Sequence, residues 1–370
     1  MKKLIFCTLI IIGFHSCELF KLDNFDAPSE TLWGEVVDVA TGKRVLTDQS
    51  GEGIRVRLRE LSWTETPTSA PFDFYCKKEG EFQNTKLFPG FYNVAIDGPF
   101  IPLVRLTEQG DTLVDESKYI DIKGGVTKVR FEVEPFLNIE WVDEPANLEG
   151  KITCSFKITR GVSPEIFKSK IEPLGGWNDN FMDVISVYLF VSGSPYVGAR
   201  EGMSENARVI HFPSAESDNK SFNDFFGFDK IITLTTDGVI PGGHTRFVRA
   251  AARIRYQTQG ISRPNYNEAK RVDVLPRMTI APLYRNIRFS ADGQSAFFGA
   301  TPIIASFTID AKVKAWKIEI DQTWLTMNDI GNTVYLFAQQ NNTGQPRDAT
   351  VTIKAEGFED FKIAVHQMDI

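Results

Sequence analysis

Apolar and charged residues alternate along much of this chain, and no other feature limits its fold so strongly. In the segment 54–59, three branched aliphatic residues alternate with three arginines, and the segment 128–134 alternates in the same way. A period of two with one apolar face is typical of a half-buried antiparallel strand. Such segments recur at short intervals, separated by Gly, Pro, Asn and Asp, as in β-sandwiches. We therefore predict an all-β protein.

The chain has 370 residues, a length that suits two or three domains. Its 48 acidic and 41 basic residues give a formal net charge of −7. A mildly acidic surface is poorly suited to nucleic acid, because binding requires basic side chains that neutralise phosphates. We therefore predict three serial β-sandwiches and no nucleic-acid partner.

The first 26 residues predict how the chain is processed and where it is held. Lys2 and Lys3 precede the apolar stretch 4–14, which is too short to span a bilayer as a helix, and Ser16 precedes Cys17. Residues 1–16 resemble a bacterial lipoprotein signal peptide, which implies that Cys17 becomes the lipidated first residue of the mature chain. An ordinary cleaved secretory signal is the alternative.

Residues 17–31 form a polar, acidic stretch without strand alternation, which predicts a flexible stalk. Acidic residues close behind the cysteine resemble the export signal of Bacteroidetes lipoproteins. That resemblance implies a lipid anchor in the outer membrane, facing the cell exterior, while retention in the inner leaflet remains an alternative.

Residues 32–136 carry a strand ending in Asp38-Val-Ala-Thr-Gly42, then Gly80-Glu-Phe82, then Pro89-Gly-Phe-Tyr92. This order resembles the carboxypeptidase-regulatory-like β-sandwich. Pro89 presets a turn and Gly90 tolerates a positive φ, so the motif residues have structural roles. The resemblance implies a scaffold and not peptidase activity.

Residues 137–274 contain a nearly continuous apolar run from Val184 to Val191 and a late strand, 247–256, that follows Pro241-Gly-Gly. These features resemble a fibronectin type III-like sandwich. Arg249, Arg253 and Arg255 make one edge of the late strand basic. Ser163 and Pro164 have the residue types of a helix cap and first helical position, so they predict one helical turn.

Residues 275–284 contain two prolines and predict a linker or the first edge of the next unit. In residues 285–370, Trp316-Lys-Ile, Trp324-Leu, the turn 341–347 and Gln367 occur in an order that resembles a BACON module. This immunoglobulin-like domain occurs in Bacteroidetes surface proteins and glycosidases and is named for a presumed association with carbohydrate.

Residue types that carry chemistry are scarce. Beyond the leader, His211, His244 and His366 are far apart in sequence, and the chain contains no nucleophile elbow, phosphate loop or dinucleotide fingerprint. Cys76 and Cys154 lack metal-type spacing, and we predict two buried free thiols. A glycosidase needs two carboxylates placed across a cleft, a requirement that sequence alone does not exclude. We predict no enzyme activity, no metal and no cofactor.

Aromatic residues in loops are the candidate ligand platforms, because the apolar faces of sugar rings stack on aromatic rings. Trp177 lies in a Gly- and Asn-rich loop beside polar neighbours, Trp63 lies among turn-forming residues, and a phenylalanine-rich loop spans 221–229. Packing against their own sandwich is the alternative for each. The candidate residues are Trp177, Asn178, Asp179, Trp63, Phe225 and Phe226.

Leader, stalk and modules together resemble an accessory surface lipoprotein of a Bacteroidetes polysaccharide-utilisation system. The resemblance implies non-catalytic glycan capture, with a TonB-dependent transporter and its lid lipoprotein as partners. The alternative is a structural or adhesive surface lipoprotein whose modules act as spacers.

Overall fold

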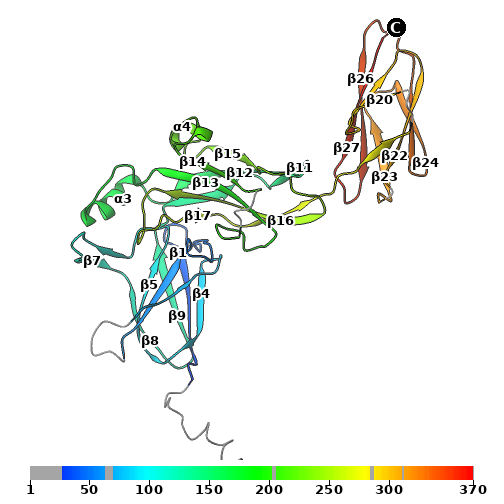
Figure 1. The fold of residues 1–370 in the computed structure, drawn as a ribbon. Coiled ribbons are helices and arrows are strands. Elements are labelled where there is room, and N and C mark those ends of the chain that lie inside the picture. The colour runs from blue at the N-terminus through cyan, green and yellow to red at the C-terminus, as the bar shows by residue number, and fades with distance from the viewer. Residues whose placement is uncertain (1–26, 63–69, 202–205, 284–286, 311, 370) are drawn as a thin grey trace, which may run out of the picture.

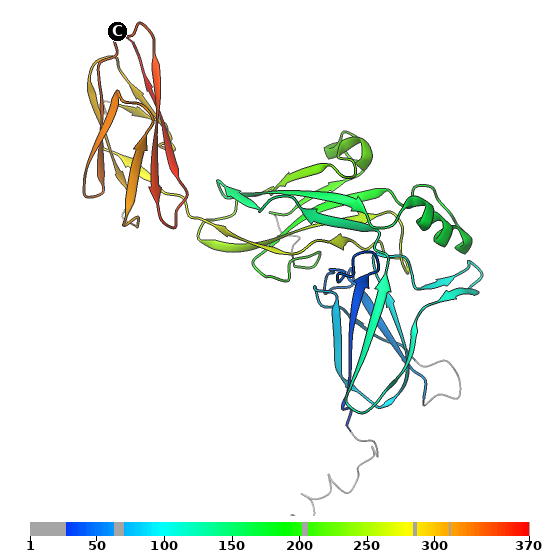
Figure 2. The ribbon, with the colours of Figure 1, turned by 180° about the vertical axis from the view of Figure 1, so that it is seen from behind.

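The protein is described by a computed structural model that covers residues 27–62, 70–201, 206–283, 287–310 and 312–369. Strands dominate these residues and form three successive β-sandwiches, which confirms the predicted all-β fold class (Figures 1 and 2). The predicted signal peptide, Cys17 and most of the predicted stalk lie outside the described residues. Among the described helices, none is long and apolar enough to cross a membrane.

The first sandwich packs two sheets around a buried core that includes Phe82 and Phe131. Its strands are β1 (Glu30–Asp38), β2 (Arg55–Glu60), β3 (Phe72–Tyr75), β4 (Glu81–Leu87), β5 (Gly90–Asp97), β6 (Val104–Leu106), β7 (Thr112–Asp115), β8 (Lys118–Ile122) and β9 (Val126–Val133). One sheet has the order β4-β1-β9, the other has the order β3-β2-β5-β8, and β6 and β7 form a separate hairpin. β1 begins at the end of the sandwich that points away from the second sandwich (Figure 1).

The second sandwich has a larger core and carries the helices. Its strands are β10 (Leu137–Trp141), β11 (Ala146–Leu148), β12 (Lys151–Arg160), β13 (Val184–Ser192), β14 (Arg208–His211), β15 (Ile231–Thr235), β16 (His244–Ile254), β17 (Asn265–Tyr266) and β18 (Lys270–Val274). Its helices are α3 (Pro164–Ile171), α4 (Phe222–Phe225) and the short η1 (Glu172–Leu174) and η2 (Ala215–Ser217). β12 pairs with β10, β11 and β15 in one sheet, and β16 pairs with β13, β17 and β18 in the other.

The third sandwich lies beyond the second and carries the C-terminal end of the chain (Figure 1). Its strands are β19 (Ile280–Pro282), β20 (Arg288–Phe289), β21 (Ser295–Phe298), β22 (Ile303–Ile309), β23 (Trp316–Ile320), β24 (Leu325–Ile330), β25 (Thr333–Ala338), β26 (Arg347–Ala355) and β27 (Phe361–Gln367). The sheets have the orders β19-β22-β25-β24 and β20-β21-β27-β26-β23.

Two details differ from, or extend, what the sequence indicates. β19 pairs with β22, so part of the segment 275–284 forms an edge strand of the third sandwich, the second of the two alternatives given for it above, and is not a linker. The helical turn predicted at Ser163 is the start of the eight-residue helix α3. The Ser163 hydroxyl accepts a hydrogen bond from the Ile166 amide at 3.3 Å and so caps that helix.

The two cysteines of the described chain are free and buried, as predicted. Cys76 lies in the first core and Cys154 in the second. Burial raises the pKa of both thiols, that of Cys154 to about 12, because the thiolate loses its hydration. Both are therefore packing residues in the protonated form.

The first and second sandwiches meet through buried polar contacts. Arg249 of β16 is only 2% exposed, which is a correction to the basic edge expected for this strand. One of its Nη1 hydrogen bonds, of 2.8 Å, reaches the carbonyl oxygen of Thr47 in the first sandwich. The Asn265 amide donates to the carbonyl oxygen of Pro99 at 3.0 Å. These directional contacts fix how the two sandwiches are oriented.

Candidate functional site

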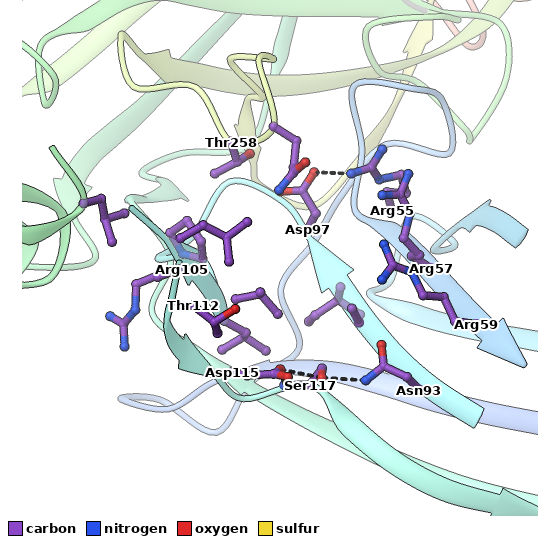
Figure 3. A pocket seen from close by; sticks show the side chains of 18 of the residues that line it. Arg55, Arg57, Arg59, Asn93, Asp97, Arg105, Thr112, Asp115, Ser117 and Thr258 are labelled. Carbon is purple, nitrogen blue, oxygen red and sulfur yellow. Dashed lines mark hydrogen bonds and ion pairs between the residues drawn. The ribbon is translucent and has the colours of Figure 1, made fainter. Parts of the chain in front are cut away.

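A groove of about 610 Å³ lies on the outer face of the first sandwich where it meets the second (Figure 3). The outward side chains of β2, β5 and β8 line one side of it. The β6–β7 hairpin lines another, and the second sandwich contributes Leu174 and residues 256–259. The groove therefore exists only where the two sandwiches are joined.

β2 supplies three arginines to the groove, because its alternation turns Arg55, Arg57 and Arg59 away from the core. Two of them are neutralised. Arg57 donates from Nε and Nη2 to the two carboxylate oxygens of Asp73, both at 2.8 Å. Arg55 lies 3.3 Å from Asp97 and 3.6 Å from Asp73. The hydrogen bond from Arg57 lowers the pKa of Asp73, so this carboxylate remains ionised at neutral pH.

Two further arginines of the groove have no carboxylate partner in the described part of the chain. Arg59 is exposed and lies opposite the neutral Asn93 of β5. Arg105 of β6 is only 9% exposed, and its Nε donates to no protein acceptor. Figure 3 shows Arg105 across the groove from the arginines of β2. Neither guanidinium is within ion-pair distance of a described carboxylate, although Arg59 is close enough to Asp73 to lower its pKa.

An aromatic surface lies beside these charges. Tyr119 of β8 is 55% exposed and Phe91 of β5 is 40% exposed. Their ring centroids are 6.3 Å apart and their planes are inclined by 31°. Arg59, Asn93 and Tyr119 are paired across β2, β5 and β8, so they form one row. Two strand spacings make this row about 10 Å long between its outer backbones.

Hydrogen bonds hold the polar groups at the Tyr119 end of the row. The Tyr119 hydroxyl donates to Asp115 at 3.1 Å, and the Ser117 hydroxyl donates to the same carboxylate at 2.5 Å. The Asn93 amide donates to the Ser117 hydroxyl oxygen at 2.6 Å. The hydrogen bonds from Ser117 and Tyr119 lower the pKa of Asp115 and keep it ionised. These side chains are therefore already oriented in the free protein.

An ion pair across the junction fixes the other end of the groove. Asp97 of β5 lies 2.9 Å from Arg263 of the second sandwich, whose side chain is 1% exposed. Arg263 also donates to the carbonyl and hydroxyl oxygens of Thr258. Burial raises the pKa of Asp97, and Arg263 and Arg55 oppose that shift. The wall made by residues 256–259 is thereby tied to the floor of the groove.

The groove offers guanidinium, amide and hydroxyl donors, two carboxylates and an exposed phenol ring. Such a set binds and orients a polar ligand through hydrogen bonds, ionic contacts and ring stacking. In the part of the chain that the structure describes, no three His, Cys, Asp or Glu side chains are grouped so that they could hold a metal ion.

The tryptophan predicted as the leading ligand platform is partly packed. Trp177 lies against Phe167 and Phe181, with ring centroids 6.1 and 5.8 Å away. Its indole nitrogen donates to Asp179 at 2.8 Å, while Asn178 accepts from a backbone amide of its own loop. Asn178 and Asp179 are exposed. These contacts favour a structural role for the loop, and ligand binding there remains a prediction.

The phenylalanine-rich loop also packs on its own sandwich. Phe225 and Phe226 are half-buried and contact Phe212, with ring centroids 5.9 Å away in each case. Both belong to the aromatic side chains that cover the second core. Trp63, the remaining aromatic candidate, lies outside the described residues.

The residues of the groove are a different set from the predicted candidates. The outward arginines of β2 follow from alternation in the sequence, but nothing local marks Asn93, Arg105 or Tyr119. Register across β2, β5 and β8 aligns Arg59, Asn93 and Tyr119. Prediction of which residues pair across these three strands could have found Asn93 and Tyr119, but not Arg105, which lies on β6.

The sequence matches no protein-family model and no curated protein. Among solved structures, the chain is similar to a DUF3823 family protein from Bacteroides uniformis ATCC 8492, with 49% identity and a TM-score of 0.62; the match covers 67% of this chain and 100% of that chain. It is more weakly similar to a protein from the same organism that is proposed to bind carbohydrate, with 19% identity, a TM-score of 0.48, and coverage of 66% and 99%. A DUF3823 family protein from Parabacteroides merdae ATCC 43184 has 17% identity, a TM-score of 0.43, and coverage of 67% and 100%.

Proposed function

This chain belongs to the DUF3823 family, and we propose that it is a non-catalytic lipoprotein that binds glycans at the cell surface. The observation that carries the proposal is the row of Arg59, Asn93 and Tyr119 in the groove. Sugar rings present apolar C–H faces that stack on an aromatic ring, and their hydroxyls bond to amide, guanidinium and carboxylate groups. The row provides both kinds of contact side by side.

The groove suits capture because its polar groups are held before a ligand arrives. Hydrogen bonds among Asn93, Asp115, Ser117 and Tyr119 reduce the conformational entropy that these side chains lose on binding. Tethering even weak sites at a membrane raises their effective concentration. In this proposal the protein holds a polysaccharide close to a TonB-dependent transporter and its lid lipoprotein.

The three sandwiches provide the framework in this proposal. The first resembles a carboxypeptidase-regulatory-like module, the second a fibronectin type III-like module and the third a BACON-like module. We propose that the first two build the glycan site at their junction and that the third extends the molecule on the far side.

The proposed location depends on a lipid at Cys17. Cells grown with an alkyne-tagged palmitate are expected to incorporate the tag into the parent protein and not into a Cys17→Ala variant, because the proposed lipid is attached at Cys17. The measurement is in-gel fluorescence after coupling of the alkyne to a dye. A parent protein that carries no label would contradict the proposed anchor.

A Tyr119→Ala variant is expected to bind glycan roughly two- to twelvefold more weakly than the parent protein. This range corresponds to about 0.5–1.5 kcal/mol of lost ring contact. Glycans that bind would first be found by affinity electrophoresis on a polysaccharide panel and then measured by calorimetry. Because Tyr119 is exposed, the substitution removes a contact surface and not a part of the core.

Tyr196→Ala is the matched control, since Tyr196 is 54% exposed but lies outside the groove. It is expected to bind like the parent, and Trp177→Ala should do the same provided that it folds. A protein that binds no glycan of the panel would favour the alternative of a structural or adhesive lipoprotein. An effect of Trp177→Ala alone would move the site to the predicted loop.

A further inference from the structure

We infer that the groove recognises acidic glycans, whose carboxylate or sulfate groups bind Arg59 and Arg105. The inference rests on the proposed function and narrows the class of ligand. It depends on which charges in the groove the protein itself neutralises.

Four arginines line the groove, and their partners divide them into two kinds. Arg55 and Arg57 are held by Asp73 and Asp97, as described above, so their charges are compensated within the protein. Across from Arg59 the paired residue is Asn93, which carries no charge. Arg59 is therefore the exposed member of the β2 arginines that forms no ion pair with a described carboxylate, although the charge of Asp73 is close enough to interact with it.

Arg105 adds a second cation, and this one is largely buried. Its side chain is nine-tenths buried, and its Nε has no acceptor among the described residues. A buried N–H group without an acceptor costs free energy, and an anionic group that bonds to the Arg105 guanidinium would recover part of that cost. Carboxylates and sulfates fit a guanidinium well, since two parallel N–H groups can bond to two oxygens.

The position of Asp115 determines how an acidic ligand would be oriented in the groove. Asp115 is engaged with Ser117 and Tyr119, at the aromatic end of the row. An anion placed there would meet a negative charge, whereas an uncharged sugar face would meet the Tyr119 ring. An acidic glycan therefore binds with a sugar face on Tyr119 and an acidic group towards Arg59, at the opposite end of the row.

The net charge of the whole chain is opposite in sign to the local charge of the groove arginines. The chain has a net charge of −7 and a sequence pI near 5.4, so a polyanion is not attracted to the protein in general. At physiological salt, exposed charges are screened beyond about 8 Å. Attraction of an acidic glycan must then come from the local charges of the groove.

The test compares matched ligands on the full chain, purified in detergent. The carboxylate probe is an oligogalacturonide, and its methyl-esterified form is the neutral counterpart. The sulfate probe is a carrageenan oligosaccharide, and its desulfated form is the counterpart. Calorimetry is expected to give at least tenfold tighter binding for one acidic probe than for its neutral form, with the difference shrinking as NaCl is added.

The Arg59→Gln variant is expected to lose about ten- to a hundredfold of the affinity for the acidic probe, and little for the neutral form. If the Arg105→Gln variant folds, it should also lose affinity for the acidic probe and keep its affinity for the neutral form. If it does not fold, the Arg59→Gln variant alone tests the inference, because Arg59 is exposed. Arg288→Gln is the control, since Arg288 is exposed on the third sandwich and has no ion-pair partner among the described residues.

The outcomes separate this inference from the proposed function. Preference for the carboxylate or for the sulfate probe supports the inference and identifies the acidic group. Equal binding of acidic and neutral forms that still depends on Tyr119 would overturn the inference and leave glycan binding intact. Absence of binding to all four probes and to the polysaccharide panel would reject both.

Discussion

Replacing Asp97 with alanine is expected to lower the free energy of unfolding by about 3–5 kcal/mol. The carboxylate lies 2.9 Å from Arg263, and the side chains of the pair are only 13% and 1% exposed. Removing one partner leaves the Arg263 charge buried without a carboxylate, because Thr258 offers it only neutral oxygens. Urea denaturation followed by circular dichroism measures the change.

A surface pair of the same length provides the control. Asp273 lies 2.9 Å from Arg271, with side chains 55% and 63% exposed. Asp273→Ala is expected to leave stability close to that of the parent, because solvent screens the exposed pair. The double variant Asp97→Ala/Arg263→Met should recover part of the loss, since it removes both buried charges. Equal effects of Asp97→Ala and Asp273→Ala would contradict a role for burial.

The pH dependence of the same site has a definite sign. Burial raises the pKa of Asp97 in the folded protein above its unfolded value of about 3.9. The part of the stability that comes from this pKa shift is therefore present below about pH 4 and is lost as the pH rises through the folded-state pKa. The loss expected for Asp97→Ala has a different cause, the Arg263 charge left without its carboxylate. The stability of the parent relative to an Asp97→Asn variant should fall from pH 4 upwards. A difference that grows with pH would show that the ion pair outweighs desolvation.

Replacing Arg249 with methionine is expected to cost about 2–4 kcal/mol of unfolding free energy. The Arg249 guanidinium donates to the carbonyl oxygens of Asn267, Thr47 and Val197, at 2.6, 2.8 and 3.4 Å. It also lies over the Tyr266 ring, with 4.6 Å to the centroid. Methionine fills much of the same volume but leaves three buried carbonyl groups without their donor. Burial lowers the pKa of Arg249 to about 10, so it is still charged at neutral pH.

Arg246→Met is the control for this change. Arg246 lies on the same strand and is half-buried, and the one hydrogen bond described for its side chain goes to the adjacent carbonyl of Thr245. Its replacement should have a much smaller effect, measured by the same denaturation experiment. If both variants lose the same stability, the contacts across the junction contribute nothing beyond ordinary packing.

Local sequence patterns correctly predicted the structural features that depend on residues close together in the chain. The segment 54–59 indicated a strand with arginines on its outer face, and β2 has that burial pattern. Ser163 and Pro164 indicated the start of α3, because capping is decided within one helical turn. These predictions succeeded since the energies involved act between residues close together in the chain.

The groove itself depends on contacts that the sequence does not mark. Arg249 looked like part of a basic edge, yet the first sandwich covers it and supplies its acceptor at Thr47. Trp177 looked like an exposed loop residue, yet Phe167 and Phe181 pack against it. In each case a partner distant in sequence decides the role of a side chain, so local pattern alone leaves the role open.

The start of β1 lies far from the junction of the first and second sandwiches. β1 has nine residues and starts at the end of the first sandwich opposite the junction. At about 3.3 Å per residue, this strand separates the chain's entry from the junction by roughly 30 Å. If the protein is anchored to a membrane at its N-terminal end, as proposed, β1 would hold the groove away from the lipid headgroups by about the length of this strand.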